Sequence, residues 1–264
     1  MSYALTDSAT MLRRNLLHAR RYPGLTLMML GMPVVLLLLF VFVFGDALAA
    51  GIGGADKTAG DYVNFLTPGI IIMTIAAGTT QTAISVCSDM TEGIIARFRT
   101  MAISRTSVLT GHVVGSMIQS VITVALLIGV ALLVGFRPNA DALHWFGAIG
   151  LLLLLSFGLT WIGVAMGLVS KSVEGASNLP MPIMYLPFLS SAFVPVESMS
   201  DGVRWFAEYQ PFTPIIDTLR GLLLGTAVGS DGPLAIAWCL VLALVGYAWA
   251  RSRFTRPMTA TAAA

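Results

Sequence analysis

Charge is scarce in this 264-residue chain: only 11% of its residues are Asp, Glu, Lys or Arg. A soluble domain typically carries about 25% charged residues. The sequence is instead 56% hydrophobic, and several apolar runs reach the length of about 18 residues that a membrane span requires. This composition excludes a soluble enzyme and indicates an integral membrane protein.

Cysteine is equally rare. Cys87 and Cys239 are the two cysteines, and both lie within or at the end of apolar runs, with no CxxC pair and no cluster of Cys and His anywhere in the sequence. Disulfide frameworks and zinc sites need such groupings. We therefore expect neither a disulfide framework nor a metal site, and we interpret both thiols as small apolar side chains.

The apolar runs predict an all-α membrane protein with six transmembrane helices. The predicted spans are Leu25–Phe44, Phe65–Cys87, Gly111–Phe136, Trp145–Ser170, Leu179–Val194 and Leu234–Ala250. The first is followed by "ALAA", which resembles a signal-peptide cleavage site, but the run exceeds the about 7–15 apolar residues of a signal peptide, so we expect a retained span. The fifth is short and contains Pro180, Pro182 and Pro187, which predict a kinked or broken segment.

The distribution of basic residues predicts the orientation. With six spans both termini lie on one side, and that side holds eleven Lys and Arg residues against four on the other. Because positive charge concentrates in cytoplasmic segments, we expect both termini in the cytoplasm. The acidic residues divide the other way, with four on the cytoplasmic side and nine outside.

None of the six predicted spans contains Asp, Glu, Lys or Arg. Proton- and ion-coupled transporters need ionisable groups at membrane depth, so this absence disfavours a secondary transporter. The only lysines are Lys57 and Lys171, and neither follows a glycine, so the sequence has no Walker A phosphate loop. If transport uses ATP, another polypeptide must hydrolyse it.

The most charged internal stretch lies in the predicted cytoplasmic loop 88–110. Ile94, Phe98 and Met101 fall on one face of a helix, with Arg97 and Arg99 beside it. Such a segment is either a basic loop held at the lipid headgroups or a docking helix for a soluble partner. Residues 1–24 have a similar character, since a stripe of Leu and Ala beside four arginines predicts an amphipathic interfacial helix.

Three segments together resemble a known family. "FLTPGIIIMT" opens the second span, "EGIIARFRTMAISR" follows it, and "YQPFTPIIDTLRGLLLG" precedes the sixth. In this order and spacing they resemble the permease subunits of type-2 ABC exporters of the daunorubicin-resistance type. The resemblance covers nearly the whole chain, with residues 25–264 as the six-span transmembrane domain.

The resemblance implies a coupling helix in loop 88–110 that docks in a groove of an ATP-binding subunit. The residues that match this element are Glu92, Gly93, Arg97, Phe98, Arg99 and Met101. It also implies two ATP-binding subunits that bind ATP and Mg, and a second permease, most simply a second copy of this chain. We expect a bacterial cell membrane location, membrane lipids as further partners, and no nucleic acid.

Segment 195–233, between the fifth and sixth spans, is too polar to cross the membrane. The resemblance implies short re-entrant helices on the external side, with Pro211 in the motif. Pro214 suits the first position of such a helix, Asp217 and Arg220 can pair at i, i+3, and Gly225 can end it. A structured outer loop with no role in a transport path is the alternative.

Two spans carry a polar stripe. Thr74, Gly78, Gln81, Ser85 and Ser88 recur at helical spacing in the second span, as do His112, Ser116, Gln119 and Thr123 in the third. Either the two stripes pack against each other, or part of the second span faces a translocation path shared with the fifth. In the latter case Thr74, Gln81 and Ser85 would line the path, with Met181 and Met184 as an adaptable apolar surface.

The leading hypothesis is therefore the permease subunit of an ATP-driven exporter, with no ATPase or other catalytic site of its own. An integral membrane enzyme acting on lipid-linked substrates is an alternative, but it needs convergent carboxylates at the interface, and the predicted cytoplasmic side has only four acids: Asp7, Asp89, Glu92 and Glu174. A channel or scaffold is another, although neither needs a docking helix. The uncharged spans suit an amphipathic or lipidic substrate such as a drug, a natural product or a lipid.

Overall fold

The computed structural model describes residues 23–49, 59–91 and 105–255, and the regular secondary structure of these residues is helical, with no strand among them. The long helices are α2 (Pro23–Phe42), α4 (Ala59–Thr91), α6 (Arg105–Val134), α7 (Ala142–Val169) and α12 (Asp231–Thr255). The short helices are α3 (Gly45–Ala49), α8 (Val173–Asn178), α9 (Met181–Tyr185), α10 (Asp201–Tyr209) and α11 (Phe212–Leu224), with 3-10 turns η2 (Leu186–Leu189) and η3 (Val196–Ser198).

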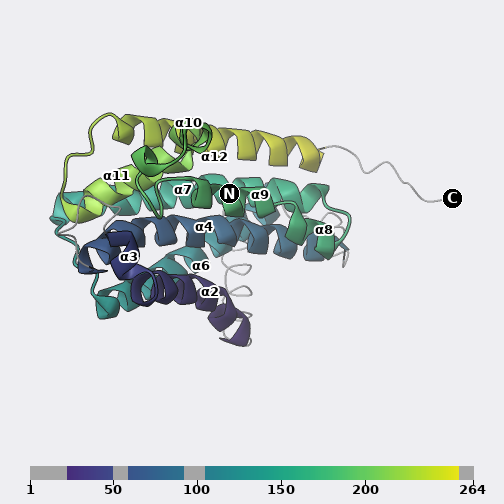
Figure 1. Cartoon of the computed structure of the whole chain (residues 1–264). Helices are drawn as coiled ribbons and strands as arrows, with labels where there is room; N and C mark the ends of the chain where they lie inside the picture. The colour runs from purple at the N-terminus through teal and green to yellow at the C-terminus, as the bar shows by residue number, and fades with distance from the viewer. Residues whose placement is uncertain (1–22, 50–58, 92–104, 256–264) are drawn as a thin grey trace.

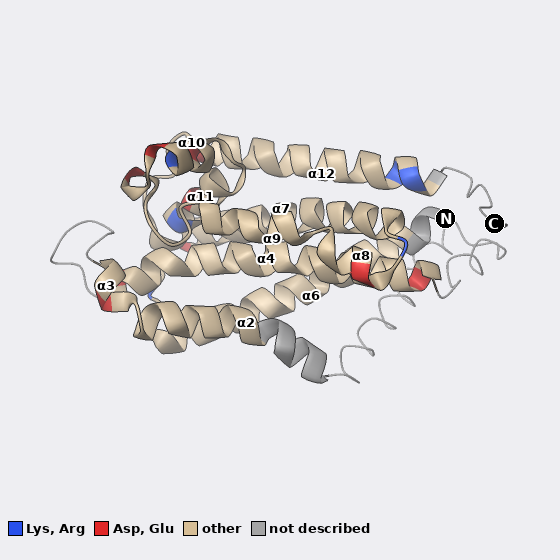
Figure 2. Cartoon of the chain, turned by 45° about the vertical axis from the view of Figure 1, so that its right-hand side comes forward, with Lys and Arg blue, Asp and Glu red and all other residues tan. Residues whose placement is uncertain are grey.

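The long helices lie side by side in layers, as Figure 1 shows. Helix α7 packs between α12 and α4, and α4 in turn contacts α6 and α2. Helices α3, α10 and α11 gather at one end of this bundle, whereas α8 and the carboxyl end of α12, with Arg251 and Arg253, lie at the other (Figure 2). The largest apolar core draws on α2, α4, α6, α7, α11 and α12.

Four described helices are long and apolar enough to cross a membrane. They are Gly60–Thr91, Leu109–Val134, Ala142–Val169 and Asp231–Phe254. Each contains most of one predicted span, so the structure supports a multi-pass membrane protein. The helices also extend past most predicted span ends, for example α4 through Thr91. The predicted ends mark where the apolar runs stop, whereas polar residues beyond those ends still continue the helix.

The predicted break in the fifth apolar run is confirmed. Pro180 precedes the five-residue helix α9, Pro187 lies in the 3-10 turn η2, and the chain leaves helical geometry at Ser190. Proline lacks the N–H that an α-helix needs, so three prolines within eight residues prevent a continuous helix. The first apolar run forms α2, a 20-residue helix that contains Pro33.

Local sequence signals explain several helix ends. Asp141 caps α7 by accepting a hydrogen bond from the His144 backbone N–H at 2.8 Å, and this bond holds the pKa of the Asp141 carboxyl below its usual range. Gly225 ends α11 with a φ of 67°, as predicted, because glycine adopts the left-handed conformation without a Cβ clash. Helix α6 ends one residue before Gly135, whose φ is 118°.

Two glycines let α7 approach α4 closely. A Cβ at Gly163 would lie 2.7 Å from the Thr79 carbonyl oxygen, and one at Gly167 would lie 2.6 Å from the Ala83 carbonyl oxygen. Real side chains essentially never approach backbone atoms so closely. Two glycines four residues apart in an apolar span predict close helix packing from the sequence alone, and the Gly163-x-x-x-Gly167 motif makes this contact.

We expect Gly167→Ala to destabilise the chain by about 1–3 kcal/mol, because the added methyl must push α7 away from the α4 backbone. Gly150 is a matched control in the same helix, since a Cβ there meets nothing within 4 Å. Gly150→Ala should be neutral or stabilising by up to about 1 kcal/mol, because alanine favours helix. Thermal unfolding of the purified variants measures both effects, and equal Tm values would contradict this packing.

Candidate functional site

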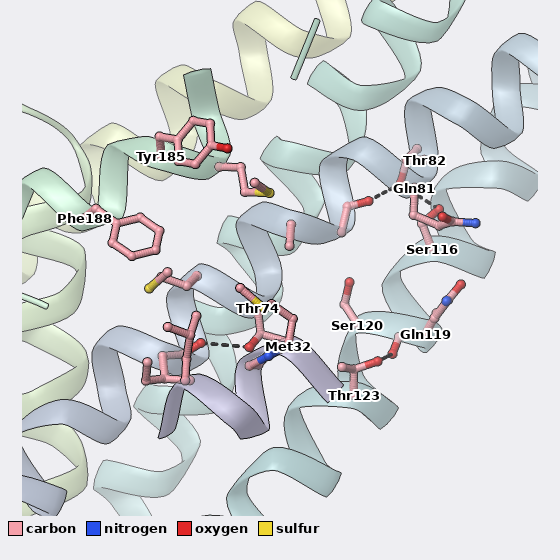
Figure 3. Close-up of a pocket in the computed structure, with 17 residues that line it drawn as sticks. Met32, Thr74, Gln81, Thr82, Ser116, Gln119, Ser120, Thr123, Tyr185 and Phe188 are labelled. Atoms are coloured by element: carbon pink, nitrogen blue, oxygen red, sulfur yellow. Dashed lines mark hydrogen bonds between the residues drawn. The ribbon is translucent and has the colours of Figure 1, made fainter. Parts of the chain in front are cut away.

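A pocket of about 340 Å³ opens between α2, α4, α6 and the broken α9–η2 segment. Figure 3 shows its side chains converging from these elements. From α2 and α4 it is lined by Met32, Pro33, Leu36, Ile70, Met73, Thr74, Ala77, Gly78, Gln81 and Thr82, and from the other helices by Ser116, Gln119, Ser120, Thr123, Met184, Tyr185 and Phe188.

The pocket has two chemically different walls and no charged lining residue. One wall is formed by α2, α9 and η2 and presents apolar and aromatic groups such as Met32, Tyr185 and Phe188 (Figure 3). The other lies on α4 and α6 and presents hydroxyl and amide groups, among them Gln81 and Gln119, while α4 also contributes the apolar side chains of Ile70, Met73 and Ala77. A molecule with an apolar body and a polar, uncharged edge would match both walls.

The polar wall combines residues of the two stripes that the sequence shows with Thr82 and Ser120, which belong to neither stripe. Thr82 Oγ1 donates to the Gly78 carbonyl at 3.1 Å and lies 3.0 Å from Ser116 Oγ, so α4 and α6 meet at this point. The Thr74 hydroxyl donates to the Ile70 carbonyl at 2.8 Å. Each stripe therefore lines the pocket in part, and α4 contacts the third-span stripe through Thr82.

Sequence reasoning placed some pocket residues and missed others. Thr74, Gln81 and Met184 line the pocket, whereas Ser85 and Met181 do not. Ser85 lies about one turn nearer the α8 end of the bundle than Gln81, and Met181 about one turn nearer it than Met184. The contributions of α2 and of Tyr185 and Phe188 were missed, because a uniformly apolar run carries no stripe that marks its pocket-facing side.

A second polar centre anchors the carboxyl end of the broken segment. The Arg220 cluster consists of Phe65, Ser191, Asp217 and Arg220. The Arg220 guanidinium pairs with Asp217 and donates to the Ser191 carbonyl at 2.6 Å and to the Phe65 carbonyl at 3.2 Å. Its Cζ lies 3.8 Å from the Phe65 ring centroid, and the Ser191 hydroxyl donates to Asp217 at 2.7 Å.

This cluster contains the ion pair that the sequence predicts between Asp217 and Arg220. It joins α11 to α4 and to the chain that follows η2. The helix itself begins earlier than expected, with Pro211 as its cap and Phe212 as its first residue. Pro214 therefore occupies the third position rather than the first, where its missing N–H still costs no intrahelical bond.

Other side chains supply hydrogen bonds to the carbonyls that the break leaves open. Gln210 Nε2 donates to the Leu186 and Leu189 carbonyls at 3.2 and 2.7 Å, and the Tyr62 hydroxyl donates to the Phe193 carbonyl at 3.3 Å. Unpaired backbone groups are costly at membrane depth, so a broken segment needs such partners. The segment that carries Tyr185 and Phe188 into the pocket is thus held by α4, α10 and α11.

The expected coupling residues lie outside the described residues. They are Glu92, Gly93, Arg97, Phe98, Arg99 and Met101. Residues 1–22 of the predicted amphipathic helix also lie outside the described residues. Within the described ranges, no three His, Cys, Asp or Glu residues group as a metal site would require.

Comparison with known proteins identifies the family. The chain is 29% identical over 225 residues to the daunorubicin resistance ABC transporter permease protein DrrB1 of Streptomyces coeruleorubidus, covering 85% of this chain and 77% of that protein. It is 22% identical over 189 residues to the probable doxorubicin resistance ABC transporter permease protein DrrC of Mycobacterium tuberculosis, covering 69% and 68%.

A third relative is the putative transport permease ycf38 of Pyropia yezoensis, 29% identical over 167 residues, which cover 61% of this chain and 56% of the relative. The model of the ABC-2 type transporter family matches residues 7–224, a range that includes the pocket and the Arg220 cluster. This match confirms the resemblance drawn from the three sequence segments. The chain belongs to the ABC-2 type transporter family.

Proposed function

We propose that this chain is the transmembrane permease subunit of an exporter that a separate ATP-binding subunit drives, and that its cargo is an amphipathic or lipidic compound. The observation that carries the proposal is the uncharged, two-walled pocket in a chain of this family. The DrrB1 relative is named for daunorubicin resistance, so daunorubicin is the probe we would use first. ATP and Mg bind to the partner subunit in this scheme.

The six-span arrangement is part of the proposal. Helix α2 is the first span, the broken segment from α9 to Val194 is the fifth, and both termini are cytoplasmic in a bacterial cell membrane. The charge distribution supports it. Eleven of the fifteen Lys and Arg residues of the sequence fall on the proposed cytoplasmic side. Among the described residues, Arg105, Lys171, Arg251 and Arg253 lie at the α8 end of the bundle, and Arg137, Arg204 and Arg220 lie at the other end. The α10 and α11 end is rich in acids: Asp46, Asp61, Asp141, Glu197, Asp201, Glu208, Asp217 and Asp231.

Under this proposal ATP binding closes the partner subunits and moves the two ends of loop 88–110. Because α4 and α6 leave that loop and form the polar wall, their movement changes the pocket directly. The Arg220 cluster and Gln210 hold the external end of the opposite, apolar wall. Cargo then leaves on the side of α10 and α11.

The double variant Phe98→Ala with Arg99→Glu tests the proposed coupling. We expect it to abolish capture of the ATP-binding subunit, or to reduce cargo-stimulated ATP hydrolysis by at least about tenfold, because it removes an apolar anchor and reverses a flanking charge. Pull-down and hydrolysis by the purified complex measure these effects. Arg204→Glu, which makes the same charge change on exposed α10, is the control, and normal values for the double variant would refute the docking helix.

We further propose a homodimer in which the first and fifth spans meet across the two-fold axis. Exposed apolar side chains on both segments support this contact, among them Val35 and Phe42 on α2 and Tyr185 on α9. The mass of the purified complex measures the stoichiometry. We expect two copies of the 28.0 kDa chain with two ATP-binding subunits, whereas one copy beside a different permease would refute the homodimer.

A further inference from the structure

Asp89 and His112 form a buried pair where α4 and α6 approach their connecting segment. The Asp89 Oδ2 and His112 Nε2 atoms lie 3.0 Å apart, and the two side chains are only 11% and 7% exposed. Asp89 lies two residues before the end of α4, and His112 lies in the second turn of α6. The pair therefore joins the two helix ends between which residues 92–104 run.

The pair also belongs to a row of polar contacts between α4 and α6, here called the polar seam, that reaches the pocket. Among these contacts it lies nearest to the segment that connects the two helices. Four residues above His112, Ser116 lies 3.0 Å from the Thr82 hydroxyl, and Ser116 and Thr82 both line the pocket. One turn further, a Cβ at Gly78 would lie 3.5 Å from the Ser120 hydroxyl, so the helices remain in contact. Asp89 is seven residues from Thr82, or about 10 Å along the helix axis.

Apolar packing surrounds this end of the seam. Val86 from α4 and Leu109 and Val113 from α6 join a buried cluster with residues of α7 and α12. A buried polar pair of this kind adds little net stability compared with apolar side chains of similar size, and its best-attested role is to fix the register of the elements it joins. Here the register is the axial position of α4 relative to α6.

We infer that Asp89 and His112 are positioning residues that form a lock between α4 and α6, because the pair prevents the two helices from sliding along each other. A displacement of the cytoplasmic ends of the two helices is therefore transmitted to the pocket. The inference rests on the proposed function, since it assumes that the ATP-binding subunit displaces these ends. It adds two residues that are neither among the expected coupling residues nor part of the pocket lining.

A cysteine in the pocket reports the transmitted motion. Ser120→Cys introduces a thiol there, while the native Cys87 and Cys239 are buried. In the complex with the ATP-binding subunit, the rate at which a small thiol reagent labels this cysteine should change by at least about fivefold between the nucleotide-free state and the state trapped with ATP and vanadate.

Two double variants then separate transmission from folding. Asp89→Leu with His112→Leu removes both members of the pair, and this variant should fold and support ATP hydrolysis, yet reduce the nucleotide-dependent change in labelling to less than about twofold. The exchange Asp89→His with His112→Asp keeps the pair and should keep most of the change.

The outcomes distinguish this inference from the proposed function. A full labelling change in the double leucine variant overturns the lock and leaves the exporter proposal intact. No change in the chain with its native pair overturns the exporter proposal and the lock with it. If the double leucine variant does not fold, the exchange variant decides, because a folded exchange variant that hydrolyses ATP without a labelling change contradicts the lock.

Discussion

Arg220→Met is expected to lower the free energy of unfolding by about 3–5 kcal/mol, because it removes the cation from a buried ion pair. Asp217 would lose its guanidinium partner, and the Ser191 and Phe65 carbonyls would lose a donor. These groups come from three segments far apart in the sequence, so the loss should loosen the contact of α11 with α4 and with the broken segment. Thermal unfolding of the purified chain measures the effect.

Arg204→Met is the matched control for this experiment. Arg204 also pairs with an acid on its own helix, Glu208, at 2.8 Å, but both side chains are nearly half exposed. Exposed pairs of this kind contribute at most about 1 kcal/mol. A Tm for Arg220→Met equal to that of Arg204→Met would show that the Arg220 cluster does not hold the α10 and α11 end of the bundle.

Ala77→Trp should reduce cargo-stimulated ATP hydrolysis and export by at least about tenfold, as expected when contacts worth 2 kcal/mol or more at the centre of a binding site are lost. Ala77 lines the pocket from α4, and an indole there would fill much of its about 340 Å³. Transport into inside-out vesicles, with daunorubicin as the probe, measures the loss.

The control is Leu244→Trp on α12, where the native side chain is 67% exposed and lies outside the pocket. This variant adds the same ring on the outer surface of the bundle and should transport normally. The ATP-binding subunit should co-purify with both variants. Normal export by Ala77→Trp would mean that cargo does not pass through this pocket.

The parts of the fold that depend on composition and local spacing were predictable from the sequence. Uncharged runs predicted the four long spans, three prolines predicted the break before Ser190, and the Gly163 motif predicted close helix packing. The Asp217–Arg220 pair was also predictable, because both residues lie on one helix at i, i+3.

Contacts between distant segments were not predictable in the same way. The Arg220 bond to the Phe65 carbonyl spans 155 residues, and the Tyr62 bond to the Phe193 carbonyl spans 131. No spacing rule relates such positions, since they meet only through tertiary packing. The apolar wall of the pocket has the same origin: Met32 and Leu36 look like any other residues of an apolar span until α2 packs beside α4.

His112 illustrates the difference between a pattern and a contact. It is visible in the sequence as the first residue of a polar stripe, near the start of its span. Its partner Asp89 belongs to the preceding helix, and only the register of α4 against α6 brings them to 3.0 Å. The sequence therefore indicated a histidine on a polar helix face but not the residue that pairs with it.

ATP-driven transport by the reconstituted complex is the most direct test of the proposed function. The chain and the ATP-binding subunit that co-purifies with it would be placed in vesicles, and accumulation of daunorubicin would be followed with and without ATP. We predict accumulation only when both subunits and ATP are present, and its loss in the Ala77→Trp variant. Equal accumulation by the chain alone, or without ATP, would contradict its role as the permease subunit of an ATP-driven exporter.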